Sequence, residues 1–319
     1  MEKLSLEQLE GERPVKKEKG VDLGRRGVLE KLFGLGVAAL TLGHPAKELV
    51  EETIMKEGTE QELFAYLERL KNDFGVEVDF SETSGNSKEA SARELSLAEK
   101  KDLAENVYQA LSLYPKEYIE QIGLRKIRGV KWMDVPRLDW YKKYLSNLKG
   151  YVDREHKDTL HLNKESVNSA LGETFGWANN ERMRYATHHE LYHVADEHIG
   201  DEAFDAQWVA DGKERGATPP DLGKYFGMRG EGYATKYGST SPHEDRAEIA
   251  AMLLTRHGRM MRLAGKEAAI EDKITKIKEE FKTRSSGLID GFYWELLQRG
   301  DAGAIQEYFA TRRALRSAK

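Results

Sequence analysis

The sequence predicts an α+β fold, with a small mixed sheet in the first half and helices in the second. Short segments typical of strands lie between residues 74 and 163, whereas helical hydrophobic patterns dominate from residue 181 onward. The length of 319 residues allows one large domain or two small ones, with a sizeable core in either case.

The first half begins with a charged helical pattern over residues 47–72, which we interpret as a stalk or linker. Residues 74–80 alternate apolar and polar side chains, as a half-buried strand does. Residues 81–91 are polar and predict a loop. A second helix is expected over residues 95–113, because its apolar residues recur at helical spacing and Tyr114-Pro115 ends the pattern.

Further strands are expected before the middle of the chain. Residues 124–135 carry apolar side chains that favour extended structure. Residues 151–153 and 159–163 are short and close in sequence, so we expect them to pair as an antiparallel hairpin. Together with residues 74–80, these segments predict the small mixed sheet.

The second half of the sequence predicts helices separated by one long loop. Helices are predicted over residues 181–199, 243–256 and 266–284, with further helical stretches over residues 288–318. Residues 200–235 are rich in glycine and proline and predict an irregular loop, and a loop of that length is usually functional. We assign residues 73–319 to one domain.

Composition excludes several classes of protein. Hydrophobic residues make up 39% and charged residues 33%, which indicates a soluble globular chain with a charged surface. The net charge of -5 argues against a nucleic-acid-binding protein, because neutralising phosphates requires an excess of basic residues. The chain has no cysteine, which excludes disulfides, thiolate metal ligands and cysteine nucleophiles. Histidine, aspartate and glutamate remain as metal ligands.

The N-terminal residues 1–46 resemble a twin-arginine export signal. Arg25-Arg26 precede the apolar run of residues 32–42, which is too short to span a bilayer as an ordinary helix. Gly24 replaces the usual hydroxyl residue before the arginines, and no small-residue cleavage site is evident. We expect an exported protein, periplasmic, cell-surface or extracellular, with transient membrane association through the signal. An amphipathic or buried helix in a cytoplasmic protein is the alternative.

The most informative residues are His189-Glu190-Leu191-Tyr192-His193, which spell H-E-x-x-H. Positions i and i+4 share one face of a helix, so His189 and His193 can hold one Zn²⁺ while Glu190 serves as general base. A chance occurrence on a surface helix is the alternative. The surrounding residues are largely apolar, however, and buried histidines require partners that a metal supplies.

A third ligand is required, and several acidic residues are candidates. Asp196 lies on the same helix as the histidines, where it suits the orientation of a ligating imidazole better than direct ligation. Glu244 and Glu248 are spaced i and i+4 on the next apolar helix, which suits one ligand and one supporting carboxylate. The helix dipole alone would account for acids at Glu244 and Asp245, but not for Glu248.

The sequence also suggests roles for three other residues near the motif. Tyr237 precedes the helix of Glu244 and could donate a hydrogen bond to an oxyanion, although ordinary packing is the commoner role of a tyrosine. His188 lies about 100° around the helix from His189, so we expect it to pack or to support a ligand rather than to bind the metal itself. His198 is expected to cap the end of the helix before Gly200.

These motifs resemble those of the gluzincin-type zinc peptidases related to the catalytic domain of anthrax lethal factor. The shared features are H-E-x-x-H, a gap of roughly 40 residues, Tyr237-Gly238, and a helix that begins Glu-x-x-Ala-Glu at Glu244. The resemblance covers roughly residues 74–260. It implies a zincin-like fold, one Zn²⁺ held by His189, His193 and Glu244, Glu190 as general base, and Tyr237 as oxyanion donor. Glu248 then supports a ligand.

The sequence thus predicts a zinc metallopeptidase, an endopeptidase acting as a monomer on peptide or protein substrates. A zinc-dependent amidase acting on cell-wall peptides would use the same site. A catalytically silent, zinc-stabilised binding protein is the third possibility, but a structural zinc site does not need Glu190.

Overall fold

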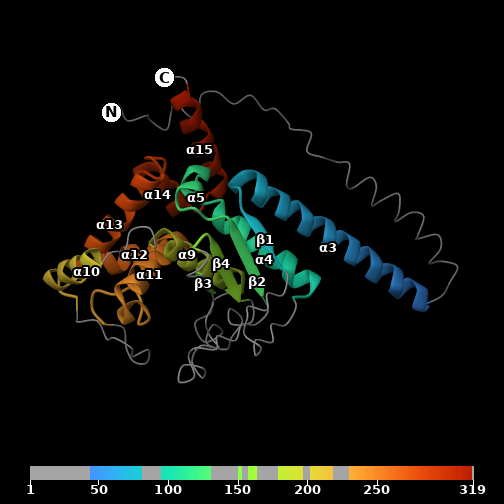
Figure 1. Ribbon diagram of the computed structural model, residues 1–319, viewed down its shortest axis with the longest axis horizontal. Coiled ribbons are helices and arrows are strands. Elements are labelled where there is room, and N and C mark those ends of the chain that lie inside the picture. Colours follow the sequence, from blue (N-terminus) through green and yellow to red (C-terminus); the bar gives the residue numbers. More distant parts are fainter. Residues whose placement is uncertain are drawn as a thin grey trace. The chain divides into compact units, whose positions relative to one another are not determined.

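The computed structural model describes most of the chain from residue 44 onward (Figure 1). The described residues are 44–80, 95–130, 150–152, 157–163, 179–196, 202–217 and 230–317. The chain divides into two compact units, Met1–Gly58 and Thr59–Lys319. Most of the expected export signal lies outside the described residues, as do the loop over 81–91 and His198.

Four strands form one mixed sheet in the order β1-β2-β4-β3. Strands β1 (Glu77–Asp79), β2 (Lys126–Val130) and β4 (Thr159–Asn163) are parallel, whereas β3 (Gly150–Val152) is antiparallel to β4. The small mixed sheet and the antiparallel hairpin are therefore confirmed.

The sheet is apolar on one face and charged on the other. Ile127 and Leu160 are paired in register and fully buried. The alternate positions carry charges, and Lys126 and Arg128 each place a nitrogen 3.9 Å from Asp79 Oδ2. Because successive side chains of a strand point to opposite faces, this alternation directs one face of the sheet into the core.

Helices account for the rest of the described fold. Ser96 and Glu99 form a capping box that starts α4, since each side chain binds the other residue's backbone N–H. The helical bounds are α3 (His44–Phe74), α4 (Leu97–Leu111), α5 (Lys116–Gln121), α9 (Asn179–Asp196), α10 (Glu202–Glu214), η1 (Gly238–Thr240), α11 (Pro242–Thr255), α12 (His257–Ala264), α13 (Ala268–Arg284), α14 (Gly291–Arg299) and α15 (Ala302–Ser317). None of the helices in the described part of the chain has the length and apolarity to cross a bilayer.

The expectation of irregular structure over residues 200–235 is wrong for its first part, which is α10. This segment has three alanines and places Trp208 in the core, 4% exposed. Helix propensity and packing therefore act together there, while the glycines and prolines that suggested a loop lie mostly beyond residue 214. The short helices α5 and α12 were not expected either, because each contains too few turns to show a periodic pattern.

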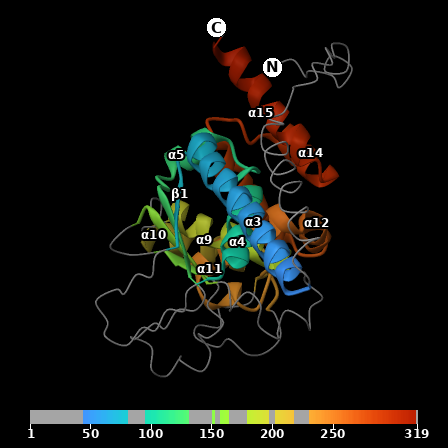
Figure 2. The same cartoon turned by 90° about the vertical axis from the view of Figure 1, so that its right-hand side faces the viewer.

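Helix α9 occupies the centre of the second unit. It packs against α4, β3 and β4 and against α11, so it lies between the sheet and the helices that follow (Figures 1 and 2). The two ion pairs Glu181–Arg256 and Asp196–Arg246 join opposite ends of α9 and α11, which shows that these helices are antiparallel. This packing brings the end of α9 to the start of α11.

Candidate metal centre

Helix α9 presents both motif histidines to one point. His189 and His193 are one helical turn apart, and their Nε2 atoms lie 3.2 Å from each other. His189 is 6% exposed, because the flanking Leu191 and Tyr192 anchor the helix in the core. The helix thus orients two imidazoles toward one position.

Helix α11 supplies a carboxylate at the same point. Ser241 caps this helix by accepting a hydrogen bond from the backbone N–H of Glu244 at 3.2 Å, and Pro242 occupies the first helical position. Glu244 therefore lies in the first turn, with its Oε2 at 3.0 Å from His189 Nε2 and 3.4 Å from His193 Nε2.

The three atoms fit the ligand shell of zinc. Ligands held tetrahedrally at about 2.0–2.1 Å from Zn²⁺ lie about 3.3–3.4 Å from one another. The observed separations of 3.0, 3.2 and 3.4 Å approach that geometry. His189, His193 and Glu244 also form a group of potential metal ligands whose donor atoms all lie within 4.8 Å. Two imidazoles and one carboxylate are the donor set of catalytic zinc sites that keep a position open for water.

The local electrostatics favour opposite charges on the imidazole and the carboxylates. Burial opposes a charge on His189, but Glu244 and Glu248 outweigh it and raise the histidine's pKa well above its ordinary value. Burial likewise opposes a charge on Glu244, yet hydrogen bonds from His189 and His193 hold the pKa of this carboxyl well below its ordinary value. The cluster therefore favours a cation among its carboxylates, which is the role a metal ion fills.

Glu248 lies on the other side of the His189 ring. Its Oε1 is 3.0 Å from His189 Nδ1, and Thr235 Oγ1 donates to its Oε2 at 2.5 Å. Burial raises the pKa of Glu248, but contacts with His189, Thr235 and Tyr185 lower it below its ordinary value overall. A charged carboxylate thus faces the ring nitrogen that would not bind the metal, as expected of a residue that orients a ligand.

The two residues with expected catalytic roles flank the same cluster. Glu190 is 6% exposed on α9. The ring centroid of Tyr237 lies 5.8 Å from that of His189, and its phenol is hydrogen bonded to Glu244. Burial and the carboxylates of Glu244 and Glu190 raise the pKa of Tyr237 well above its ordinary value. The phenol therefore keeps its proton at neutral pH and can donate it in a hydrogen bond.

The structure gives Asp196 partners other than the ligating imidazole expected from the sequence. Its two oxygens accept hydrogen bonds from Arg246, Nε to Oδ1 at 3.0 Å and Nη2 to Oδ2 at 2.7 Å. Asp196 Oδ2 also lies 2.7 Å from Nδ1 of His243. Glu248, rather than Asp196, is the carboxylate that faces the second ring nitrogen of a motif histidine. The sequence reasoning overlooked that α11 brings an arginine to Asp196.

His188 packs in the interior, as its position on α9 suggests. Its Nδ1 lies 2.9 Å from the hydroxyl of Tyr114, and the side chain is 1% exposed. Burial, assisted by Arg184, lowers the pKa of His188 to about 3, so this imidazole is neutral at pH 7.

Buried charges around α11 were not predicted from the sequence. Arg246 is fully buried between Asp196 and Asp205. The neighbouring Asp245 accepts from Lys273 Nζ at 2.6 Å and from Trp208 Nε1 at 2.9 Å. The available signal was the occurrence of Asp245-Arg246 within an otherwise apolar helix, where buried charges require partners from other elements.

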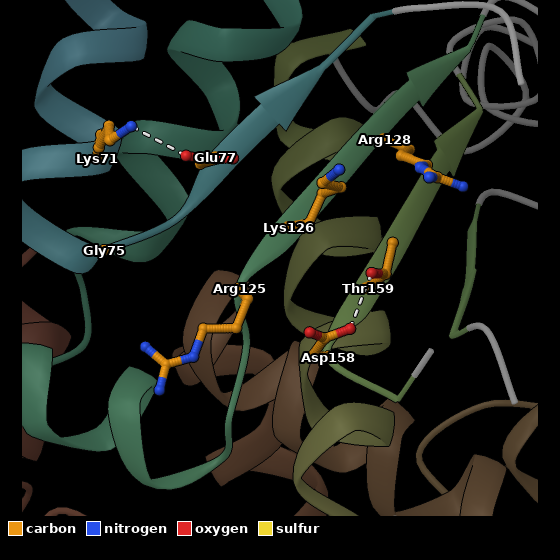
Figure 3. Close-up of a pocket in the computed structure, with 8 residues that line it drawn as sticks. All are labelled: Lys71, Gly75, Glu77, Arg125, Lys126, Arg128, Asp158 and Thr159. Atoms are coloured by element: carbon orange, nitrogen blue, oxygen red, sulfur yellow. Dashed lines mark hydrogen bonds and ion pairs between the residues drawn. The ribbon is translucent and has the colours of Figure 1, made fainter. Parts of the chain in front are cut away.

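An open groove of about 580 Å³ lies elsewhere, where the parallel strands begin (Figure 3). None of the candidate ligands lines it. Lys71 forms an ion pair with Glu77 at 2.9 Å, and Asp158 accepts a hydrogen bond from the hydroxyl of Thr159 at 3.0 Å. We therefore place the candidate functional site at the cluster on α9 and α11, where potential metal ligands converge, and not at this groove.

Comparisons with known proteins do not identify a family for this chain, so its function has to be argued from the chemistry of the site. No protein-family model matches the chain, and no curated protein is significantly similar to it in sequence. Among solved structures, the chain is similar to a protein from Bacteroides caccae described as a candidate zinc-binding metallo-peptidase. The two share 16% identity with a TM-score of 0.46, over 79% of this chain and 95% of the other. Similarity at that level transfers no function.

Proposed function

We propose that this chain is a zinc-dependent metallopeptidase of the gluzincin type. The observation that carries the proposal is the convergence of His189, His193 and Glu244 at separations that suit one zinc ion. The resemblance to the lethal factor catalytic domain supports it, because Tyr237 stands seven residues before Glu244 in the sequence and lies beside it in the fold.

The roles of the residues follow from their chemistry. Zinc, when bound, supplies a Lewis acid that lowers the pKa of a water molecule and polarises the substrate carbonyl. Glu190 accepts the proton of the attacking water and delivers it to the leaving amine. Tyr237 donates a hydrogen bond to the oxyanion that develops on the carbonyl. Glu248 keeps the His189 ring in the orientation that ligation requires.

The proposed substrate is a peptide or protein, and the proposed setting is outside the cytoplasm. Export rests on Arg25-Arg26 and the apolar run that follows. We also propose a monomer, and the net charge of -5 supports a protein without nucleic-acid partners. Glu190 favours an enzyme over a silent zinc-binding protein, because a purely structural site needs no general base.

Measurement of bound zinc together with peptide cleavage tests the proposal. The wild-type chain should bind one zinc ion and cleave casein or a peptide library. Glu190→Gln should retain the zinc and lose cleavage. Equal cleavage by both proteins would contradict the mechanism, and cleavage of cell-wall peptides alone would support the amidase instead.

A further inference from the structure

Arg246 and Asp196 form a two-bonded ion pair inside the protein. The Nε and Nη2 atoms of Arg246 donate to the two carboxylate oxygens of Asp196, at 3.0 and 2.7 Å. The arginine side chain is fully buried and the aspartate side chain is 1% exposed. A paired fork of this kind fixes both the distance and the relative orientation of the two side chains.

The surroundings of Arg246 complete the pair. Its Nη1 donates to Asp205 of α10 at 2.8 Å, and its guanidinium lies 5.7 Å from the ring centroid of Trp208. His243 Nδ1 lies 3.0 Å from Nη2. Burying a charged pair removes much of its net contribution to stability, and in some proteins such a pair instead fixes one arrangement of the chain.

The position of the pair identifies the arrangement that it fixes. Asp196 follows His193 by three residues on α9, and Arg246 follows Glu244 by two residues on α11. The pair therefore joins the two helix ends that supply the ligands. A second α9–α11 ion pair, Glu181–Arg256, joins the opposite ends and is partly exposed.

We propose that Arg246, acting through Asp196, is a positioning residue that holds Glu244 at ligand distance from His189 and His193. This inference rests on the proposed zinc site. Arg246 touches neither metal nor substrate. The pair fixes how closely the start of α11 approaches the end of α9, because it is bidentate and fully buried and lies two residues from Glu244.

The test separates positioning from stability. Arg246→Met should weaken zinc binding about 10-fold, the lower range seen when residues supporting metal ligands are replaced, and should also destabilise the fold. The double variant Arg246→Met/Asp196→Leu removes both charges. Its stability in urea unfolding should recover relative to Arg246→Met. Its zinc affinity, measured by chelator competition, should remain about 10-fold below that of the wild type. The visible spectrum of bound Co²⁺ should change with it.

Further variants keep the test decisive if the double variant does not fold. Arg246→Lys retains the charge without the fork and should weaken zinc binding by a smaller factor. Arg256→Met breaks the ion pair at the other ends of α9 and α11, and Ile305→Ala removes buried apolar atoms from α15. Both control variants should bind zinc as the wild type does.

The possible results distinguish the two proposals. Wild-type zinc affinity and an unchanged Co²⁺ spectrum in the double variant, or in Arg246→Lys if the double variant does not fold, would overturn the positioning role. Equal losses of affinity in Arg246→Met and Ile305→Ala would also overturn it, because general destabilisation would then explain both. If the wild-type protein itself binds no zinc, or if His189→Ala binds it equally well, the proposed function fails first.

Discussion

Glu248 lies against Nδ1 of His189, at 3.0 Å, while Glu244 lies against Nε2 of the same ring at 3.0 Å. The imidazole is therefore held between two carboxylates from one helix, spaced i and i+4. Because a carboxylate faces Nδ1, Nε2 is the ring nitrogen left for a metal. The i and i+4 spacing of the two glutamates therefore lets Glu244 serve as a ligand while Glu248 supports the histidine.

Replacement of Glu248 should weaken zinc binding. Glu248→Ala removes the carboxylate beside His189 Nδ1, and loss of such partners lowers metal affinity about 10–100-fold. Chelator competition measures the change. Glu271→Gln, an exposed acid on α13, is the control and should leave affinity unaltered. Unchanged zinc affinity in Glu248→Ala would show that His189 needs no carboxylate support.

Replacement of Tyr237 should affect catalysis without affecting the metal. The raised pKa keeps the phenol protonated, so the wild-type residue can donate to the oxyanion, whereas Phe cannot. Tyr237→Phe should lower kcat by about 10²–10³, the range found when comparable donors are removed. Peptide cleavage and zinc content are measured on the same samples. An intact cleavage rate with zinc bound would remove Tyr237 from the mechanism.

The sequence anticipated the parts of the fold with long or local signals. The helix of His189 and His193 and the helix of Glu244 were expected because each carries several turns of apolar residues. The helix α10 was not, since the glycines and prolines after residue 214 dominated the reading of that region. Trp208 of this helix is buried and donates to Asp245, a contact with a distant residue that local sequence does not reveal.

In the candidate site, too, residues with a local sequence signal were predicted and contacts between distant segments were not. Spacing within a helix suggested His189, His193, Glu244 and Glu248, because positions i and i+4 are neighbours in any helix. The partner of Asp196 could not be obtained this way. Its bond to Arg246 spans 50 residues and depends on how α11 packs against α9, which local sequence does not encode.

The twin arginines should direct export of the chain. A fusion of residues 1–46 to a reporter that functions only outside the cytoplasm should be exported by a bacterium with a twin-arginine translocase. Replacing Arg25 and Arg26 together by lysine should abolish that export, since the pair is the recognised feature. Lys16 and Lys17 changed together to arginine serve as a control outside the motif. Export that persists without the arginine pair would contradict a twin-arginine signal, whereas a wild-type fusion that stays inside the cell would leave the buried-helix interpretation.

Acid should destabilise the protein partly through His188. Burial lowers the pKa of this histidine to about 3, whereas an unfolded chain has the ordinary value near 6.5. Between these values the unfolded state binds the additional proton, so stability falls as pH falls through this range. From pH 7 to pH 5 the loss from this one group is about 2 kcal/mol.

His188→Gln removes the titrating group and keeps an acceptor for the hydroxyl of Tyr114. Urea unfolding at pH 7 and pH 5, with excess chelator so that metal release does not contribute, measures the effect. The wild-type protein should lose about 2 kcal/mol more than the variant between the two values. The same loss in both proteins would mean that folding does not lower the pKa of His188, which its bond to Tyr114 and its burial argue against.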